Sequence, residues 1–208
     1  MSLKFVKEYW NNSAKNSNVK SVISPTSRDP YLAKLERDFI ISCLKKNYNC
    51  LEIGCGDALN TFYYVSKVKK ILATDNSEKL LSIAQKKLVL KKINNLKFQN
   101  ISAIELPEKF NKKFDCVISQ RCLINLDSWN NQKKTINKIN KILKKNGAFV
   151  LTEGFEDRLK NLNKVRKKYK LKSIKVARYN KFLDSKKFET YVKKYFKIKK
   201  IYSYGIYT

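Results

Sequence analysis

The residues whose types and spacing best suggest a binding site lie in two places about twenty positions apart. In the stretch LEIGCGDALN, residues 51–60, an apolar run leads into a Gly-X-Gly turn at Gly54 and Gly56. Only glycine lets the backbone turn this tightly and approach a ligand without obstruction by a Cβ atom. The next apolar run ends in Asp75, where an acidic side chain can accept hydrogen bonds from ribose hydroxyls. Together the two signals predict a site for a nucleoside cofactor.

The sequence also excludes several kinds of binding and catalytic site. A pyrophosphate-binding turn has the pattern G-x-G-x-x-G, but Leu59 occupies the third glycine position. The chain contains no His, which excludes His-based general bases, Ser-His or Cys-His dyads and His-ligated zinc or haem. Any reaction must therefore use carboxylates, amides, hydroxyls, thiols, the backbone or the cofactor, and we expect no metal.

The spacing of apolar residues predicts strands that alternate with helices. Strands are expected at 49–53, 70–74, 96–101, 114–119 and 148–152, with one more in the alternating tail, 195–208. Helices are expected at 30–46, 59–68, 77–91, 129–145, 157–169 and 185–194, with Ser128 capping the fourth and Gly147 ending it. This order is typical of a doubly wound parallel sheet.

Further motifs accompany the glycine turn and Asp75. Residues 114–119 read FDCVIS at the fourth strand, and residues 143–151 read LKKNGAFVL at the end of a helix and the fifth strand. In this order, from about residue 49 to 152, the sequence resembles the class I S-adenosylmethionine (SAM) dependent methyltransferases. The resemblance implies SAM as cofactor and S-adenosylhomocysteine as product.

The resemblance also implies which residues bind the cofactor. Those that match the glycine-rich turn beside the methionine part of SAM are Glu52, Gly54, Cys55 and Gly56. Those that match the ribose and adenine contacts are Asp75, Asn76, Ser102 and Ala103, although the family usually has Asp where Ser102 stands. Ser119, which closes the fourth-strand motif, is also expected to contact the cofactor. Arg28 either pairs with the SAM carboxylate or forms only a helix-start ion pair with Asp29.

The fold that the resemblance implies is an α/β, Rossmann-like, doubly wound and mostly parallel sheet in three layers, α/β/α. We expect one domain over residues 1–208, with residues 1–31 as a leading lid segment and 157–208 as a basic C-terminal part. The family's sheet ends in an antiparallel strand, which we expect to be short or missing here, or completed by another chain.

Open α/β sheets bind ligands beyond the carboxyl ends of their strands, so the methyl acceptor should lie above the fourth and fifth strands. Glu153 or Asp127 would accept a proton or orient the nucleophile there, and Arg121 would hold a carboxylate or phosphate of the substrate. Each has a simpler alternative. Asp127 would cap the next helix, Glu153 would lie in a solvated loop, and Arg121 would be a surface cation.

Three functions remain open. We favour methyl transfer to nitrogen or oxygen of a small-molecule acceptor, such as a sugar, an amine or another metabolite. The second is RNA methylation that uses the basic C-terminal region, although the Asp/Asn-Pro-Pro motif of adenine methyltransferases is absent after the fourth strand. The third is a non-catalytic SAM-binding subunit that needs a partner chain.

The formal net charge of +29 would favour anionic partners, and about half of it lies in residues 157–208. A genome with A/T-rich codons would give the same abundance of Lys, Asn and Ile. The sequence has no apolar leader or bilayer-spanning run, and its five Cys form no CxxC pair. We therefore expect a cytoplasmic protein, either alone or as a homo- or hetero-oligomer.

Overall fold

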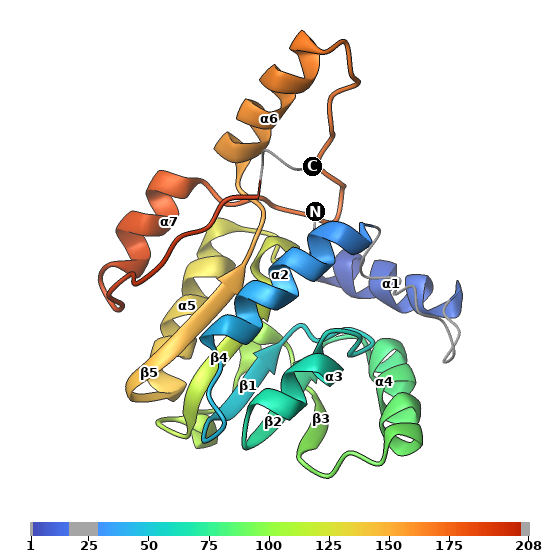
Figure 1. Cartoon of the computed structure of the whole chain (residues 1–208), viewed down its shortest axis with the longest axis vertical. Helices are drawn as coiled ribbons and strands as arrows, with labels where there is room; N and C mark the ends of the chain where they lie inside the picture. The colour runs from blue at the N-terminus through green and yellow to red at the C-terminus, as the bar shows by residue number, and fades with distance from the viewer. Residues whose placement is uncertain (1, 17–28, 205–208) are drawn as a thin grey trace.

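A computed structural model describes residues 2–16 and 29–204. Its centre is a five-stranded parallel sheet in the order β3-β2-β1-β4-β5 (Figure 1). The strands are β1 (Asn49–Ile53), β2 (Lys70–Asp75), β3 (Leu96–Asn100), β4 (Phe114–Gln120) and β5 (Leu143–Thr152). The first four lie where the sequence predicts them. The reversal of strand order between β1 and β4 creates the crevice in which such sheets bind ligands.

Seven α-helices lie among the described residues. They are α1 (Leu3–Ser13), α2 (Pro30–Cys43), α3 (Thr61–Tyr64), α4 (Glu78–Lys91), α5 (Trp129–Ile142), α6 (Glu156–Lys168) and α7 (Ser185–Val192). Side-chain oxygens cap several of them, because the first N–H groups of a helix have no intrahelical acceptor. Asp29 caps α2, Ser77 caps α4 and Ser128 caps α5.

The sheet is the middle layer of three. Side chains alternate between the two faces of a strand. The residues that pack toward α5 on one face include Leu51, Ile53, Val117, Ile136 and Ile139. The residues that pack against α2, α3 and α4 on the other face include Ile40, Cys50, Tyr64, Leu81, Cys116 and Ile118. Figure 1 shows α2 and α3 in front of the sheet and α5 behind it. The expected three-layer α/β/α arrangement is confirmed.

Several helix ends differ from the prediction, such as that of α2 at Cys43 instead of residue 46, and two differences have a clear cause. α3 begins only at Thr61 because Ala58 has a left-handed backbone, with φ of 62°, which cannot continue a helix. α5 ends at Ile142, and Leu143 already pairs with Phe114 in the sheet. Gly147 therefore does not end the helix. It lies in a bulged start of β5, where a Cβ atom would come within 3.0 Å of the Lys144 carbonyl oxygen.

The predicted strand in the tail is wrong for residues 195–204. These residues form no ladder with β5, which is the edge strand of the sheet in the described part of the chain. Side chains of the tail pack instead. Phe196 contacts Phe149 with ring centres 5.7 Å apart, and Tyr202 contacts Phe39 of α2 at 5.4 Å. The apolar alternation reflects this packing without backbone pairing, and no antiparallel strand occurs among the described residues.

Across residues 2–16 and 29–204, no helix combines the length and the apolar character that crossing a membrane requires.

Candidate cofactor and acceptor site

The glycine turn after β1 meets two constraints, one from its own backbone angles and one from the loop after β4. Gly54 and Gly56 have φ of +69° and +58°, which only glycine adopts readily. A Cβ atom on Gly54 would also come within 2.6 Å of the Cys122 sulfur, in the loop after β4. Gly54 is therefore required both for the turn and for the close approach of that loop. The glycine turn and the loop after β4 share one wall of the site.

Asp75, at the end of β2, holds the other side of the turn. Its Oδ2 accepts a hydrogen bond from the Gly56 N–H at 2.8 Å, and its Oδ1 accepts one from the Ser77 N–H at 2.7 Å. Burial raises the pKa of its carboxyl, and these N–H donors partly offset the shift. A carboxylate has about four acceptor positions. Asp75 therefore retains capacity to accept hydrogen bonds from the hydroxyls of a ribose.

A continuous cavity of about 1630 Å³ opens over these residues. Drug-sized ligands occupy pockets of about 300–1,000 Å³, so this cavity has room for a cofactor and a second molecule. The predicted cofactor residues that line it are Glu52, Gly54, Cys55, Gly56, Asp75, Asn76, Ser102 and Ala103. Arg28 lies outside the described residues, and Ser119 does not line the cavity.

Glu52 carries an unusual buried group. Within the described chain its Oε2 is enclosed and has no hydrogen-bond partner. Burial raises the pKa of this carboxyl to about 7, the Thr61 hydroxyl nearby lowers it, and the charge of Asp75 raises it. A buried polar atom without a partner is costly unless a ligand or water satisfies it. With the glycine turn and Asp75, this atom makes the cavity suitable for a nucleoside with polar substituents, and the residues fit SAM.

The raised pKa of Glu52 predicts a pH dependence of stability. Between the ordinary value of 4.5 and about 7, the folded protein keeps a proton that the unfolded chain releases. Stability should therefore fall as the pH rises through this window. Glu52→Gln should reduce this slope by about 1.4 kcal/mol per pH unit. Urea denaturation at pH 5, 6 and 7 measures it, with the exposed Glu108→Gln as the control. An unchanged slope in Glu52→Gln would contradict the prediction.

Glu153 follows β5 and fixes the loop after β4. Its Oε1 accepts hydrogen bonds from the Ser119 hydroxyl at 2.7 Å, the Cys122 N–H at 3.1 Å and the Leu123 N–H at 2.9 Å. Its Oε2 accepts one from the Ile124 N–H at 3.2 Å. Burial raises the pKa of the carboxyl to about 7, although the Ser119 hydroxyl bond lowers it. Glu153 lines the cavity, but these four donors make it an anchor for the loop.

This network also accounts for Ser119. The residue is completely buried, and its hydroxyl is bound to Glu153. The placement does not support the predicted contact between Ser119 and the cofactor. Asp127 is likewise absent from the cavity lining, and its Oδ1 accepts a hydrogen bond from the Asn131 side chain at 2.7 Å, in the first turn of α5. This geometry favours a role for Asp127 at the start of the helix and does not support a catalytic one.

Arg121, the residue after β4, is held rigidly at the cavity wall. Its backbone is left-handed, with φ of 55°, a conformation that costs about 1–3 kcal/mol outside glycine. Its N–H donates to Thr152 O at 2.8 Å. Its Nε donates to both carboxyl oxygens of Glu36 at 2.9 and 3.1 Å. Glu36 lies on α2, is buried, and also accepts from the Gln120 side chain at 3.1 Å. Arg121 is therefore not a loose surface cation.

The bond at Nε leaves the rest of the guanidinium available. Within the described chain, the two Nη groups of Arg121 have no hydrogen-bond partner, and its side chain is 32% exposed. Guanidinium groups form paired hydrogen bonds with carboxylates and phosphates. Glu36 thus fixes the guanidinium plane, and the Nη donors remain for a ligand in the cavity.

α1 and the segment before α7 form a roof over the cavity. The Trp10 indole donates to the Asn125 side chain at 2.9 Å, and the Ser77 hydroxyl donates to Asn11 at 2.7 Å. Tyr9 stacks on Tyr179 with ring centres 4.0 Å apart. α1 therefore spans from the Asp75 side of the cavity to the loop after β4. The lid role of residues 1–31 stays a prediction.

Two partners in this site were not predicted from the sequence. Glu36 lies on the buried stripe of α2 together with Ala33 and Ile40. Lys87 occupies the buried stripe of α4 and forms an ion pair with Asp57 at 2.7 Å. A charged residue at an apolar position of an amphipathic helix signals a buried partner, because unpaired charges are rarely buried. That signal was present in both helices.

The sheet order, the glycine turn and Asp75 define an α/β protein with a cavity suited to a nucleoside cofactor at the strand-order reversal. Residues 44–201 match the family model described as "Methyltransferase domain". This match covers more than half of the chain, and the chain therefore belongs to the methyltransferase domain family. It is an SAM-dependent methyltransferase of the class that the sequence motifs predict. No curated protein sequence matches it significantly.

Solved structures support the fold. The Haemonchus contortus phosphoethanolamine N-methyltransferase 1, solved with phosphoethanolamine and S-adenosylhomocysteine, is 18% identical with a TM-score of 0.66, and the match covers 90% of this chain and 39% of that one. The putative methyltransferase in complex with the Haloferax volcanii Trm112 activator is 14% identical, with a TM-score of 0.65 and coverage of 89% and 74%. The Bacillus subtilis YcgJ protein is 15% identical, with a TM-score of 0.63 and coverage of 77% and 67%. At these identities the likeness concerns the fold alone.

Proposed function

We propose that this protein transfers a methyl group from SAM to nitrogen or oxygen of a small molecule that carries a carboxylate or phosphate. The observation that carries the proposal is the roof over the acceptor side of the cavity. Trp10 closes onto Asn125, and Tyr179 packs against Trp10 with ring centres 5.0 Å apart. A concave site roofed by aromatic side chains, with a few fixed polar groups, suits a small ligand better than an RNA helix.

The residues of the chain would contribute by positioning. Bound SAM supplies the activated methyl group. Glu153 would hold the loop after β4 against the glycine turn, and Arg121, fixed by Glu36, would bind the anionic group of the acceptor. The roof would exclude water from the reacting atoms. Orientation and desolvation of this kind supply much of the rate in a displacement whose leaving group is already activated.

One relative's substrate is consistent with this acceptor class. The Haemonchus enzyme was solved with phosphoethanolamine, which joins an amine to a phosphate. The phosphate of such an acceptor would suit Arg121, and its amine would be the nucleophile that takes the methyl group. Identity of only 18% leaves the particular molecule to experiment, and RNA and a partner-dependent role remain as outcomes of the test.

The test uses SAM labelled in its methyl group and a panel of amines and alcohols, each in a neutral form and in a form bearing a carboxylate or phosphate. We expect label on one or more anionic members and none on their neutral counterparts. Labelling of transfer RNA alone would overturn the proposal in favour of RNA methylation. Binding of SAM without transfer to any acceptor would favour the non-catalytic subunit.

The role of Arg121 is tested on the acceptor found. Arg121→Gln should raise the acceptor KM about 10- to 100-fold, because a hydrogen bond to a charged group contributes about 1.5–3 kcal/mol. The affinity for S-adenosylhomocysteine should stay unchanged. Arg178→Gln, at an exposed position, is the matched control. An unchanged acceptor KM in Arg121→Gln would remove Arg121 from the acceptor site.

A further inference from the structure

α6 and the segment that follows it project from the body of the protein. We call residues 156–178 the basic arm. Figure 1 shows α6 standing beyond the sheet, with the return segment beside it. α6 contains no buried residue, and all residues from 167 to 176 are exposed. A core-building helix would bury one apolar face, so the arm does not serve the core.

The arm is nevertheless a defined structure. The Asn163 side chain forms two hydrogen bonds with the backbone of Ile174, at 2.8 and 2.9 Å. Arg166 Nε donates to the Lys172 carbonyl at 2.8 Å. At the base, the Glu156 N–H donates to Leu183 O at 2.8 Å. These bonds hold the return segment against α6.

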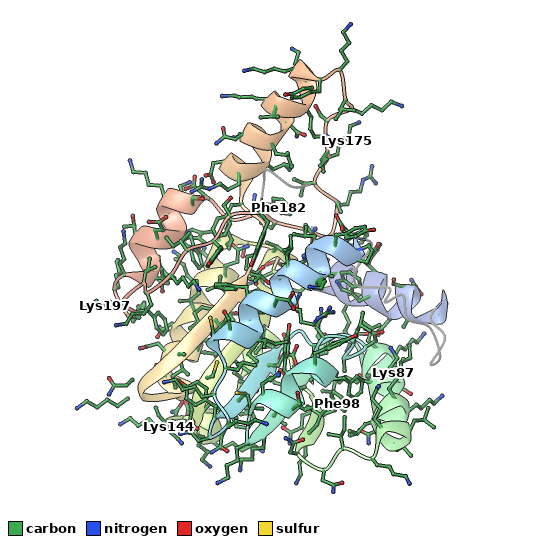
Figure 2. All side chains as sticks on the ribbon, viewed as in Figure 1. Lys87, Phe98, Lys144, Lys175, Phe182 and Lys197 are labelled. Atoms are coloured by element: carbon green, nitrogen blue, oxygen red, sulfur yellow. The ribbon has the colours of Figure 1, made fainter. Side chains whose placement is uncertain are left out.

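The basic arm exposes both cationic and apolar side chains. The arm contains ten Lys or Arg and two Asp or Glu, a net charge of +8, and no acidic residue lies between positions 158 and 178. Its exposed apolar side chains are Val165, Tyr169, Leu171, Ile174 and Val176. Figure 2 shows Lys175 on the return segment, extending away from the sheet. Basic groups interspersed with exposed aliphatic ones are the composition of surfaces that bind at a lipid interface.

We propose that the basic arm docks this methyltransferase on an anionic lipid bilayer surface. The cations would attract the lipid headgroups, and Leu171 and Val176 would enter the boundary between headgroups and acyl chains. A binding site for single-stranded RNA would expose aromatic rings for base stacking, but among the large exposed apolar residues of the arm only Tyr169 is aromatic. The lipid surface therefore explains the aliphatic side chains, and RNA does not.

Docking would also orient the active site. Arg158, Leu159, Leu162 and Ile174 of the arm line the large cavity. The base of the arm is thus one wall of the cleft, and an arm resting on a bilayer would bring the mouth of the cleft close to the lipid surface. This inference does not depend on which acceptor is methylated.

The test is cosedimentation of the full chain with two kinds of vesicle. One is phosphatidylcholine alone, and the other is phosphatidylcholine with about 30% phosphatidylglycerol, which gives it a negative surface charge. We expect binding to the anionic vesicles only, with an affinity that falls as salt increases. Lys170→Gln/Lys172→Gln should weaken binding about 30-fold, from about 1 kcal/mol for each Lys near the surface. Leu171→Ser/Val176→Ser should weaken it by at least about tenfold.

Matched controls come from α4, which lies on another part of the molecule (Figure 1). Lys79→Gln/Lys86→Gln removes two exposed Lys, and Val89→Ser/Leu90→Ser removes two exposed aliphatic side chains. All four variants should bind S-adenosylhomocysteine as the unmodified chain does. Equal loss of vesicle binding in the arm and α4 variants would overturn the proposal. So would equal binding to both vesicles, no vesicle binding, or binding of a single-stranded RNA oligonucleotide through the arm without vesicle binding.

Discussion

Asp75→Ala should weaken the binding of S-adenosylhomocysteine by about 100-fold or more, measured by isothermal titration calorimetry. Asp75 would accept hydrogen bonds from the ribose hydroxyls, and each bond to a charged acceptor contributes about 1.5–3 kcal/mol. Two such bonds correspond to at least about 3 kcal/mol, which is a factor of about 100 in the dissociation constant. The substitution also frees the Gly56 and Ser77 N–H groups that Asp75 holds. The turn itself would then be less well ordered for binding.

The interpretation depends on separating binding from folding. Asp38→Ala is a suitable control, because Asp38 is exposed on α2 and, among the described residues, its one ion pair is with Lys34, at 2.7 Å. It should leave the affinity unchanged. Asp75→Asn, which keeps one oxygen acceptor, should bind with intermediate affinity. If Asp75→Ala is folded by urea denaturation and binds as tightly as the unmodified chain, the nucleoside lies elsewhere and the cofactor assignment is wrong.

The sheet could be predicted because its signals are local. Apolar runs such as residues 116–118, within β4, are typical of strands covered on both faces. The elements that the sequence misplaced depend on contacts between distant segments or on a single backbone angle. α3 starts late because Ala58 is left-handed, and the tail packs its rings on β5 and α2 without pairing its backbone. Periodicity alone does not distinguish a strand from an extended segment that packs by its side chains.

Some residues of the candidate site could likewise be predicted from the sequence, and others could not. Gly56 and Asp75 lie 19 positions apart, at the ends of the neighbouring strands β1 and β2, and the structure brings them together. Glu153 and Arg121 were assigned to the acceptor from their position after a strand. Their partners could not be deduced, because Ser119 lies 34 positions from Glu153 and Glu36 lies 85 positions from Arg121. The partners change the interpretation: Glu153 becomes an anchor for a loop, and Arg121 becomes a preorganised donor.

The ion pair between Lys87 and Asp57 links α4 to the glycine turn. The ammonium and the carboxylate are 2.7 Å apart, and their side chains are 9% and 2% exposed. Figure 2 shows Lys87 beside α4. Asp57 directly follows Gly56, so the pair fixes the turn on which the cofactor would lie. Buried charges lose most of their hydration, and each member of such a pair depends on the other for compensation.

Lys87→Met should therefore lower the free energy of unfolding by about 3–5 kcal/mol, because the buried carboxylate of Asp57 would lose its ion pair with Lys87. Urea denaturation followed by tryptophan fluorescence measures this change. Lys34→Met, which breaks the exposed pair with Asp38, should cost no more than about 1 kcal/mol. The double variant Lys87→Met/Asp57→Asn removes both charges and should recover part of the loss. If the loss of unfolding free energy in the double variant equals the sum of the losses in Lys87→Met and Asp57→Asn, the two residues are not coupled. The turn would then owe its position to the backbone bonds of Asp75.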